Sequence, residues 1–273
     1  MSASIDWLDY AVGDHRIGCP RCARRAADRT AGLTIGADGR GVLHCFRCGL
    51  VLTHQHQISP SVKRAVQPSH EKRTTLGEWG LALWDRCQPV RGVAAEYLQS
   101  RKCRIPPADG DLRWCPALKH PSGYVGPALV ALITDAVTRQ RLSLHRTWIT
   151  PTGKAALETP RLPLAGHSTA GGCIRLWPDE AVTVGLGVAE GIESALSLAW
   201  AYTPVWALID AGHLSKFPVL DGIESLVIAR DQDQAGIKAA SECATRWARA
   251  GREVLATSQA QNDLNDVLLE EAA

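Results

Sequence analysis

Three carboxylates follow apolar runs in the second half of the chain. The run 182–189 is followed by Glu190, and the run 225–229 is followed at alternate positions by Asp231 and Asp233. Each run has the length and the β-branched bias of a strand. Side chains at alternate positions point the same way, so the two aspartates can reach one ion. Because carboxylate oxygens suit Mg²⁺ or Mn²⁺, the sequence predicts a divalent-metal site.

The segments around these acids alternate between strand-like and helix-like patterns. A helix is expected over 192–201, a third short strand over 205–209 and a further strand over 253–257. The helix after Asp233 is expected to bury one face, made of Ile237, Ala240, Ala244 and Trp247. Strands that alternate with helices form a parallel sheet, and function collects at its carboxyl edge. We therefore expect Glu190 to approach the aspartates from a neighbouring strand.

Four cysteines near the amino terminus have the spacing of a zinc site. They form two C-x2-C pairs, Cys19 with Cys22 and Cys45 with Cys48, which bracket a hairpin-like stretch. Two such pairs provide four thiolates in a tetrahedron, the usual arrangement of structural Zn²⁺. The gap between the pairs is slightly long, and a hairpin turn at 37–39 would absorb the extra residues. One zinc ion is expected to supply the folding free energy of this small segment.

Basic side chains surround these cysteines. Seven arginines lie within residues 16–47, and arginines on a zinc ribbon commonly contact phosphate. Phe46 lies inside the second C-x2-C pair and suits stacking on a nucleobase. Covering the small core of the ribbon is an equally good role for this ring. The pattern indicates a polyanion as a partner of this segment.

The composition is that of a soluble globular protein. The chain has 273 residues, of which 45% are hydrophobic and 21% charged. No apolar run approaches the roughly 18 residues of a membrane helix, and no secretory signal is visible. Nine cysteines in a chain of this length fit a reducing compartment, so we expect a cytoplasmic protein without a membrane partner. Five cysteines lack a partner at metal spacing and are expected to be core or surface thiols, namely Cys87, Cys103, Cys115, Cys173 and Cys243.

The middle of the chain combines two helices with a β-hairpin. A capping-box pattern at 75–78 precedes a helix with Trp79, Leu83 and Trp84 on its expected buried face, and a second helix is predicted over 94–101. Two apolar runs within 127–149, separated by a turn at 135–139, predict the hairpin. Thr152, Gly153 and Lys154 resemble the end of a P-loop. That motif requires a glycine where Trp148 stands, so no ATPase is expected.

The acids resemble the Toprim domain, which bacterial-type primases, topoisomerases and some nucleases share. The resemblance is carried by Glu190 after one strand and by the D-x-D-x-x-G run 231–236 after a later one. Residues 94–101 and 144–175 resemble the segment before the Toprim domain in DnaG-like primases of the phage and plasmid type. The zinc ribbon is similar to theirs as well. The likeness covers about residues 15–270 in matching order.

The resemblance implies an α/β fold with three parts. A Rossmann-like Toprim domain with a mainly parallel sheet follows an α+β primase subdomain and a small β zinc ribbon. The expected segments are a tail (1–14), the zinc ribbon (15–52), a linker (53–73), a basic subdomain that binds template and nucleotide (74–178), and the metal-binding Toprim domain (179–273). The net charge of +2 conceals this order, since Lys and Arg outnumber Asp and Glu before residue 179 and the reverse holds after it.

The implied activity is synthesis of short RNA primers on single-stranded DNA, with attack of a 3′-hydroxyl on the α-phosphate of a nucleoside triphosphate. The resemblance assigns Mg²⁺ or Mn²⁺ to Glu190, Asp231 and Asp233. It assigns catalytic roles to Lys154 and Arg146, and nucleotide or template binding to Arg161, Arg175 and Lys238. The roles of four more acids stay open, namely Glu193, Asp210, Asp263 and Asp266. A separately encoded replicative helicase is a further partner that the resemblance suggests.

Two other functions are compatible with the sequence. A Toprim-type nuclease would use the same acids to cut DNA and would need no zinc ribbon. A non-catalytic adaptor for single-stranded DNA would keep all its activity without the acids and would depend on the zinc cysteines. Polymerisation, cleavage or binding alone therefore distinguishes the three hypotheses.

Overall fold

The computed structural model describes residues 5–25, 28–37, 39–54 and 72–270. The chain divides into two units, residues 1–69 and residues 70–273. Most of the expected linker and Asp38 in the expected hairpin turn lie outside the described residues. None of the described helices is long and apolar enough to cross a membrane.

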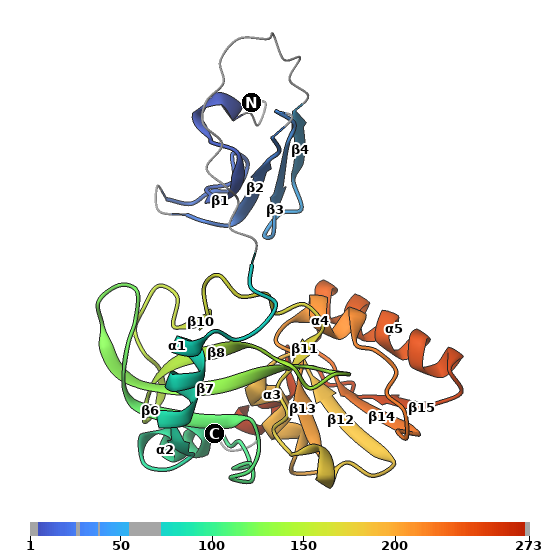
Figure 1. The fold of residues 1–273 in the computed structure, drawn as a ribbon. Helices are drawn as coiled ribbons and strands as arrows, with labels where there is room; N and C mark the ends of the chain where they lie inside the picture. The colour runs from blue at the N-terminus through green and yellow to red at the C-terminus, as the bar shows by residue number, and fades with distance from the viewer. Residues whose placement is uncertain (1–4, 26–27, 38, 55–71, 271–273) are drawn as a thin grey trace. The chain divides into compact units, whose positions relative to one another are not determined.

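The first unit is a four-stranded antiparallel sheet with the order β1-β2-β3-β4 (Figure 1). Its elements are a 3-10 turn at Trp7–Asp9, β1 at Gly13–Ile17, β2 at Ala31–Ile35, β3 at Gly41–Cys45 and β4 at Val51–His54. Alternate residues of β2 and β3 are buried, which gives a small core around Leu33 and Leu43. Because Cys19 and Cys45 belong to this core, the cysteine site and the core are one structure.

The second unit begins with two helices and an antiparallel sheet. The helices are α1 at Glu78–Arg86 and α2 at Val93–Ser100. The strands are β5 at Gln88–Pro89, β6 at Leu112–Lys119, β7 at Val125–Asp135, β8 at Arg141–Thr150, β9 at Gly153–Lys154, β10 at Arg161–Pro163 and β11 at Gly172–Cys173. The sheet has the order β10-β8-β7-β6-β5, with β11 paired to β7 and β9 paired to β8. The long strands β7 and β8 form the predicted hairpin.

The two helices cover opposite faces of this sheet. Residues of α1, such as Leu83 and Trp84, pack with Leu144 and Trp148 of β8. Residues of α2, such as Tyr97, pack in a separate core on the other face of the sheet. Since alternate residues of a strand point to opposite faces, neighbouring residues of β8 serve different cores.

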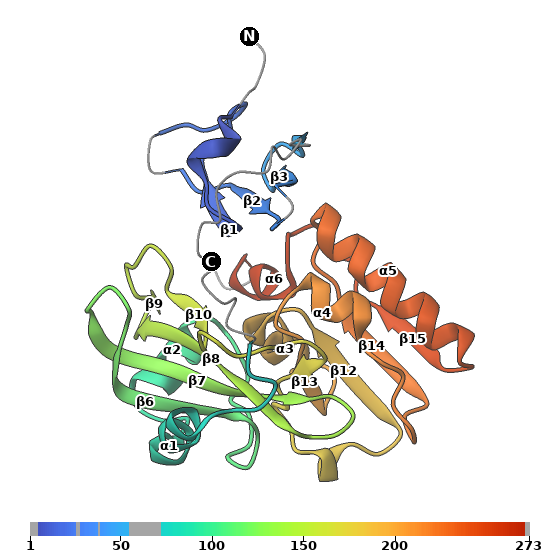
Figure 2. The same cartoon turned by 45° about the horizontal axis from the view of Figure 1, so that its top comes forward.

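The second unit ends in a parallel sheet with the order β13-β12-β14-β15 (Figure 2). Its strands are β12 at Gly185–Ala189, β13 at Val205–Ala207, β14 at Ser225–Ala229 and β15 at Glu253–Ala256. Its helices are a 3-10 turn at Asp179–Ala181, α3 at Ile192–Leu198, α4 at Ala211–Lys216, α5 at Gln234–Arg249 and α6 at Leu264–Glu270. Helices α4 and α5 pack on one face of the sheet, and α3 with α6 lies on the other. The expected α/β fold with a parallel sheet behind antiparallel ones is confirmed.

The two sheets of the second unit are joined through their backbones. Ile174 and Ala207 exchange two hydrogen bonds of 2.8 and 2.9 Å between the peptide after β11 and strand β13. One hydrophobic core contains residues of α2, β7, α3 and β13 together. The relative placement of the antiparallel and parallel sheets is therefore determined by a shared core, which lets side chains from both meet at one site.

Three expectations about the helices need correction. The first helix begins at Glu78 with Gly77 as its N-cap and no side-chain cap, so Thr75 forms no capping box. Trp79 is 57% exposed and Ile237 is 42% exposed, although both were expected on buried faces. Other residues expected on the same faces are buried, namely Leu83 and Trp84 in α1 and Ala240 and Trp247 in α5. All five cysteines without metal spacing are buried.

Candidate functional site

The three predicted acids lie at the carboxyl edge of the parallel sheet. Glu190 directly follows β12, and Asp231 and Asp233 follow β14, which is the parallel neighbour of β12. The register pairs Ala189 with Ala229, so the two strands end at the same level. The local sequence explains this arrangement, because each strand is a run of buried apolar residues that stops where the first polar side chain meets solvent.

A glycine shows how closely these acids approach one another. A Cβ atom on Gly236, in the first turn of α5, would lie 2.8 Å from the Asp231 Cβ and 2.9 Å from the Glu190 Oε1. It would also lie 2.7 Å from the Asp231 carbonyl oxygen. These distances are below normal contact, so only glycine fits between the two acids. The D-x-D-x-x-G spacing therefore has a steric reason.

Two of the carboxylates each have one buried oxygen without a hydrogen-bond partner among the described residues. The Oε1 atom of Glu190 and the Oδ1 atom of Asp231 have no donor within the described part of the chain. Burial, together with the charges of Asp231, Asp233 and Asp210, raises the pKa of Glu190 to about 7. Unpaired buried carboxylate oxygens are costly, and a divalent cation would compensate them.

The third acid combines two tasks. The Oδ1 atom of Asp233 accepts a hydrogen bond of 2.7 Å from the Gly236 backbone N–H and thereby caps α5. In the described residues, the carboxylates of Glu190, Asp231 and Asp233 do not form a group whose ligand atoms all lie within 4.8 Å of one another. The donor chemistry and the unpaired oxygens of Glu190 and Asp231 fit Mg²⁺ or Mn²⁺.

Two more acids extend this negative edge. Burial and the charges of Asp263, Asp233 and Asp266 raise the pKa of Asp231 to about 6. Asp263 precedes α6, and its Oδ1 accepts a hydrogen bond of 2.9 Å from the Asp266 backbone N–H. Asp263 therefore caps α6 while it contributes negative charge next to Asp231.

Lys154 is linked to the helix that follows Glu190 through a half-buried ion pair. Its Nζ is 3.0 Å from the Oε1 of Glu193, which belongs to the first turn of α3, three residues after Glu190. The Tyr97 hydroxyl of α2 donates a hydrogen bond of 2.7 Å to the same oxygen. Burial acts to raise the pKa of Glu193, but the Lys154 charge and the Tyr97 hydroxyl lower it to about 2. Lys154 is thus held in place by an ionised acid of the parallel-sheet half.

His145 of β8 lies close enough to Lys154 and Arg161 for their charges to act on its imidazole. His145 and Thr147 alternate with Arg146, and Arg161 of β10 is paired with Thr147 across the sheet. Burial, with the positive charges of Arg161 and Lys154 among the contributors, lowers the pKa of His145 to about 4. The His145 Nδ1 is buried and has no partner among the described residues. A neutral imidazole therefore lies among the predicted phosphate-binding cations.

The structure does not bring Arg146 to this face. Adjacent residues of a strand point to opposite sides, so Arg146 faces the core under α1. Its guanidinium lies 5.3 Å from the Trp148 ring centroid and donates a hydrogen bond of 3.0 Å to the Pro163 carbonyl. Arg146, which the resemblance grouped with Lys154 as catalytic, therefore lies on the opposite face of β8.

Arg175 and Lys238 also lie away from the acids. Arg175 is buried, donates to Asp179 at 2.8 Å and lies 4.5 Å from the Trp206 ring centroid, and it further donates to the Thr134 hydroxyl and the Ala136 carbonyl. These contacts tie the hairpin to the parallel sheet and leave no donor for a nucleotide. Lys238 lies on α5 with 77% of its side chain exposed, 3.8 Å from Glu242.

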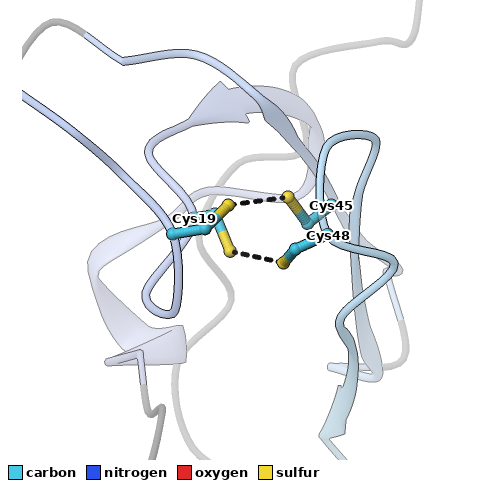
Figure 3. Close-up of side chains that lie close together, drawn as sticks. Cys19, Cys45 and Cys48 are labelled. Atoms are coloured by element: carbon cyan, nitrogen blue, oxygen red, sulfur yellow. Dashed lines mark hydrogen bonds between the residues drawn. The ribbon is translucent and has the colours of Figure 1, made fainter.

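The four predicted zinc ligands converge in the first unit. Their sulfur atoms all lie within 4.8 Å of one another. The Cys19 and Cys48 sulfurs are 3.7 Å apart and the Cys22 and Cys45 sulfurs 3.6 Å. Figure 3 shows Cys19, Cys45 and Cys48 converging from the two knuckles. The edge of a tetrahedron of thiolates around zinc measures about 3.8 Å. Burial opposes ionisation of Cys45, but the backbone N–H groups of Cys48 and Arg47 lower its pKa to about 6. The cluster fits one structural zinc ion.

Other residues of the first unit clarify the predicted polyanion surface. Arg47 donates to the Asp28 carboxylate at 2.7 Å and to the Cys22 carbonyl at 3.1 Å, so it supports the cysteine knuckle. Phe46 is 62% exposed, and the Arg16 guanidinium lies 4.5 Å from its ring centroid. The ring therefore offers an open surface, and the core of the ribbon is formed without it.

Sequence reasoning missed Tyr97, His145 and Asn265. Asn265 of α6 is fully buried and donates to the Arg101 carbonyl at 2.6 Å and to the Ser197 hydroxyl at 3.0 Å. It joins α6 to the ends of α2 and α3. The partners of Tyr97 and Asn265 are far away in sequence, so spacing carried no signal for them. A histidine within the apolar run of β8 was the signal that could have identified His145.

Comparisons with known proteins agree with part of this description. Residues 185–273 match the Toprim domain family. Residues 75–176 match a second family, described as a domain of unknown function (DUF7146). No curated protein matches the chain.

Similar solved structures include several primases at low sequence identity. The primase fragment of the bacteriophage T7 primase-helicase protein is 18% identical, with a TM-score of 0.45 over 94% of this chain and 95% of that chain. The Aquifex aeolicus primase with its zinc binding and RNA polymerase domains is 13% identical, with a TM-score of 0.46 over 97% and 80%. A DNA primase domain from Pseudomonas aeruginosa is 14% identical, with a TM-score of 0.40 over 71% and 74%.

The Toprim match covers the strands and acids that carried the resemblance in the sequence. Together with the four-cysteine cluster, it supports the resemblance to DnaG-like Toprim primases with an amino-terminal zinc ribbon. Residues 185–273 therefore match the Toprim domain family and follow a four-cysteine cluster that fits a zinc ribbon.

Proposed function

We propose that the protein is a DNA primase that synthesises short RNA primers on single-stranded DNA from nucleoside triphosphates. The observation that carries the proposal is one buried oxygen on each of Glu190 and Asp231, without a partner among the described residues, at one sheet edge. Lys154 is paired with Glu193 in the helix that follows Glu190. A metal-dependent nucleotidyl transfer needs both the acids and the lysine. The carboxylates hold the divalent metal ion, and a positioned ammonium group holds the phosphates.

The acids would hold the divalent ion. Glu190, Asp231 and Asp233 supply hard oxygen ligands, and the raised pKa values of the first two mean that ion binding is coupled to proton release. When bound, Mg²⁺ or Mn²⁺ supplies Lewis-acid stabilisation of the attacking 3′-hydroxyl and of the departing pyrophosphate. Asp263 and Asp266 add negative charge that favours a cation at this edge.

The basic residues of the hairpin would orient the nucleotide. Lys154 is held by Glu193, whose carboxylate also accepts from Tyr97, so the ammonium group is positioned before the substrate binds. Arg161 lies exposed on the same face and can contact phosphate or the template backbone. Neutral His145 adds a polar group without further charge. The four-cysteine ribbon, with Phe46 and Arg16 exposed on it, would contact the template.

Primer synthesis by the purified full chain tests this proposal. The assay supplies diverse single-stranded templates, Mg²⁺ or Mn²⁺, and either ribo- or deoxynucleotides, and products are resolved on a gel. Asp231→Asn should reduce synthesis by at least about 100-fold, because it removes a charge that the transition state requires. Asp109→Asn, an exposed aspartate outside the site, is the charge-matched control and should leave synthesis unchanged.

The same assay distinguishes the alternatives. Cleavage of DNA without polymerisation would favour a Toprim nuclease that uses the same acids. Template binding that survives Asp231→Asn, with neither synthesis nor cleavage in the unaltered protein, would favour an adaptor. Either result would refute the primase proposal. A helicase supplied separately is the partner to test once synthesis has been observed.

A further inference from the structure

A pocket outside the acid cluster opens at the end of β13. It has a volume of about 320 Å³ and lies between α4 and the loop of residues 168–172. Three of its lining residues are basic or imidazole side chains, Lys72, His213 and Lys216, and Asp210 is the acid among them. The volume is at the lower end of the range for small-molecule sites.

The hydrogen bonds of His213 make it a cation. Its Nδ1 lies 2.8 Å from the Oδ1 of Asp210, and its Nε2 lies 2.7 Å from the Thr169 carbonyl oxygen. A carbonyl oxygen accepts only, and an ionised carboxylate accepts only, so both ring nitrogens must donate. Burial acts to raise the pKa of Asp210, but its bonds to His213 lower it, which keeps the carboxylate ionised.

The pocket therefore has a positive charge balance. The imidazolium of His213 neutralises Asp210, and the two lysines remain. Neither Lys72 nor Lys216 has an ion-pair partner in the part of the chain that the structure describes. Two unpaired ammonium groups around a small pocket are a site for a multiply charged anion.

The backbone at this pocket is constrained in the way that binding sites often are. Ile209, just before Asp210, has a φ of 72°, a conformation that β-branched residues rarely adopt. On the facing loop, a Cβ at Gly172 would lie 2.8 Å from the Thr169 carbonyl, the same carbonyl that accepts from His213. The surrounding packing holds both walls in place, which is the condition under which such strain is found at functional sites.

We propose that this pocket binds the phosphate chain of a nucleoside triphosphate through Lys72 and Lys216. The position fits the proposed function, on which the choice of nucleotide rests, because Asp210 follows β13 and Glu190 follows its neighbour β12. A phosphate chain held here lies one strand away from the acid cluster and needs no divalent ion for binding.

Binding without added Mg²⁺ or Mn²⁺ tests the pocket separately from primer synthesis. Isothermal titration of the zinc-loaded full chain at low salt, with neither ion added, measures the affinity for inorganic tripolyphosphate, for a nucleoside triphosphate and for a short single-stranded oligonucleotide. Lys216→Met should weaken tripolyphosphate and nucleotide binding by at least about tenfold, the effect of one lost charged hydrogen bond. The double change with Lys72→Met should weaken them further. Lys216→Arg should restore most of the affinity.

The controls separate this inference from the proposed function. Lys119→Met removes an exposed lysine outside both sites and should leave all three affinities unchanged. Asp231→Asn should reduce synthesis by at least about 100-fold while tripolyphosphate binding without added Mg²⁺ or Mn²⁺ persists. The inference is overturned if Lys216→Met binds tripolyphosphate as tightly as the unaltered protein. It is also overturned if only oligonucleotide binding weakens, because the lysines would then contact the template.

Discussion

At the scale of single residues, Glu193 is the hydrogen-bond acceptor that holds Lys154 in position. One of its oxygens accepts from both Lys154 and Tyr97, so three elements meet at one carboxylate. A buried carboxylate without its cation is costly, because desolvation is then uncompensated. The sequence placed Glu193 one turn beyond Glu190, and its partners came from segments about forty and one hundred residues earlier.

Removing the cation of this pair should destabilise the protein. Lys154→Met leaves the Glu193 carboxylate buried beside Tyr97 alone, and we expect a loss of about 2 kcal/mol in the free energy of unfolding, discounted because 30% of the Lys154 side chain is exposed. Adding Glu193→Gln should recover much of this loss. Lys238→Met, at an exposed surface pair, should change stability by less than about 0.5 kcal/mol. Urea denaturation measures all four proteins, and equal losses in both lysine variants would contradict the argument.

His145 should make the second unit sensitive to acid. Its pKa of about 4 in the folded protein lies below the value of about 6.5 for an unfolded chain. Between these values the unfolded chain binds more protons, so stability falls as pH decreases through this range. The melting temperature of the His145→Gln variant should therefore fall less between pH 7 and pH 5 than that of the unaltered protein.

A histidine of the first unit provides the comparison for this pH effect. His44→Gln changes an exposed position and should leave the acid dependence as it was. Parallel melting curves for the unaltered protein and the His145→Gln variant would contradict a neutral, buried imidazole beside Lys154.

At the scale of elements, the metal-binding edge depends on how closely α5 starts beside β12. The first turn of α5 passes between the Asp231 backbone and the Glu190 carboxylate at Gly236. The cap from Asp233 fixes this turn, so one aspartate positions the helix and is also a proposed ligand. Helix α6 is also held by a side chain. Asn265 donates hydrogen bonds to the Arg101 carbonyl and the Ser197 hydroxyl, which fixes α6 against α2 and α3.

Gly236→Ala should impair activity more than folding. The new methyl group would meet Asp231 and Glu190 at less than 3 Å, so α5 must shift and the acids must separate. We expect primer synthesis to fall by at least about tenfold with a loss of about 1–3 kcal/mol in stability. Gly153→Ala, where a methyl group meets no atom within 4 Å, is the steric control. Full activity of Gly236→Ala would show that the acids need no such closeness.

At the scale of the whole molecule, the two units depend on different sources of stability. The first unit has a small core to which Cys19 and Cys45 themselves contribute. The described part of the second unit has three hydrophobic cores, two of which contain residues from both of its sheets. The first unit should therefore need its metal, whereas the second should fold without zinc.

Zinc removal should unfold one unit selectively. After treatment with a strong chelator, hydrogen exchange should become fast in peptides within residues 5–54 and stay slow in the cores of residues 72–270. Cys45→Ser should reproduce this pattern without a chelator, and Cys243→Ser, at a buried cysteine of α5, should leave the first unit protected. Protection of residues 5–54 in zinc-free protein would disprove the dependence.

Much of this protein could be predicted from local patterns. The strand 225–229, the β-hairpin, the cysteine spacing and the order of the acids after their strands all follow from periodicity and from side-chain chemistry. The prediction is less accurate where a helical face carries more apolar residues than the folded core buries. Trp79 and Ile237 fit a buried helical face by spacing, but tertiary packing leaves both of them exposed.

The sequence by itself determined that acids end two adjacent strands, that four cysteines share a site, and that a Toprim-like order runs through the chain. Only the tertiary structure decided which basic residues reach the acids. Lys154 reaches Glu193, whereas Arg146 and Arg175 are turned into packing contacts. The physical reason is that a strand's alternation assigns each side chain to a face, but the chain must fold before either face has a partner.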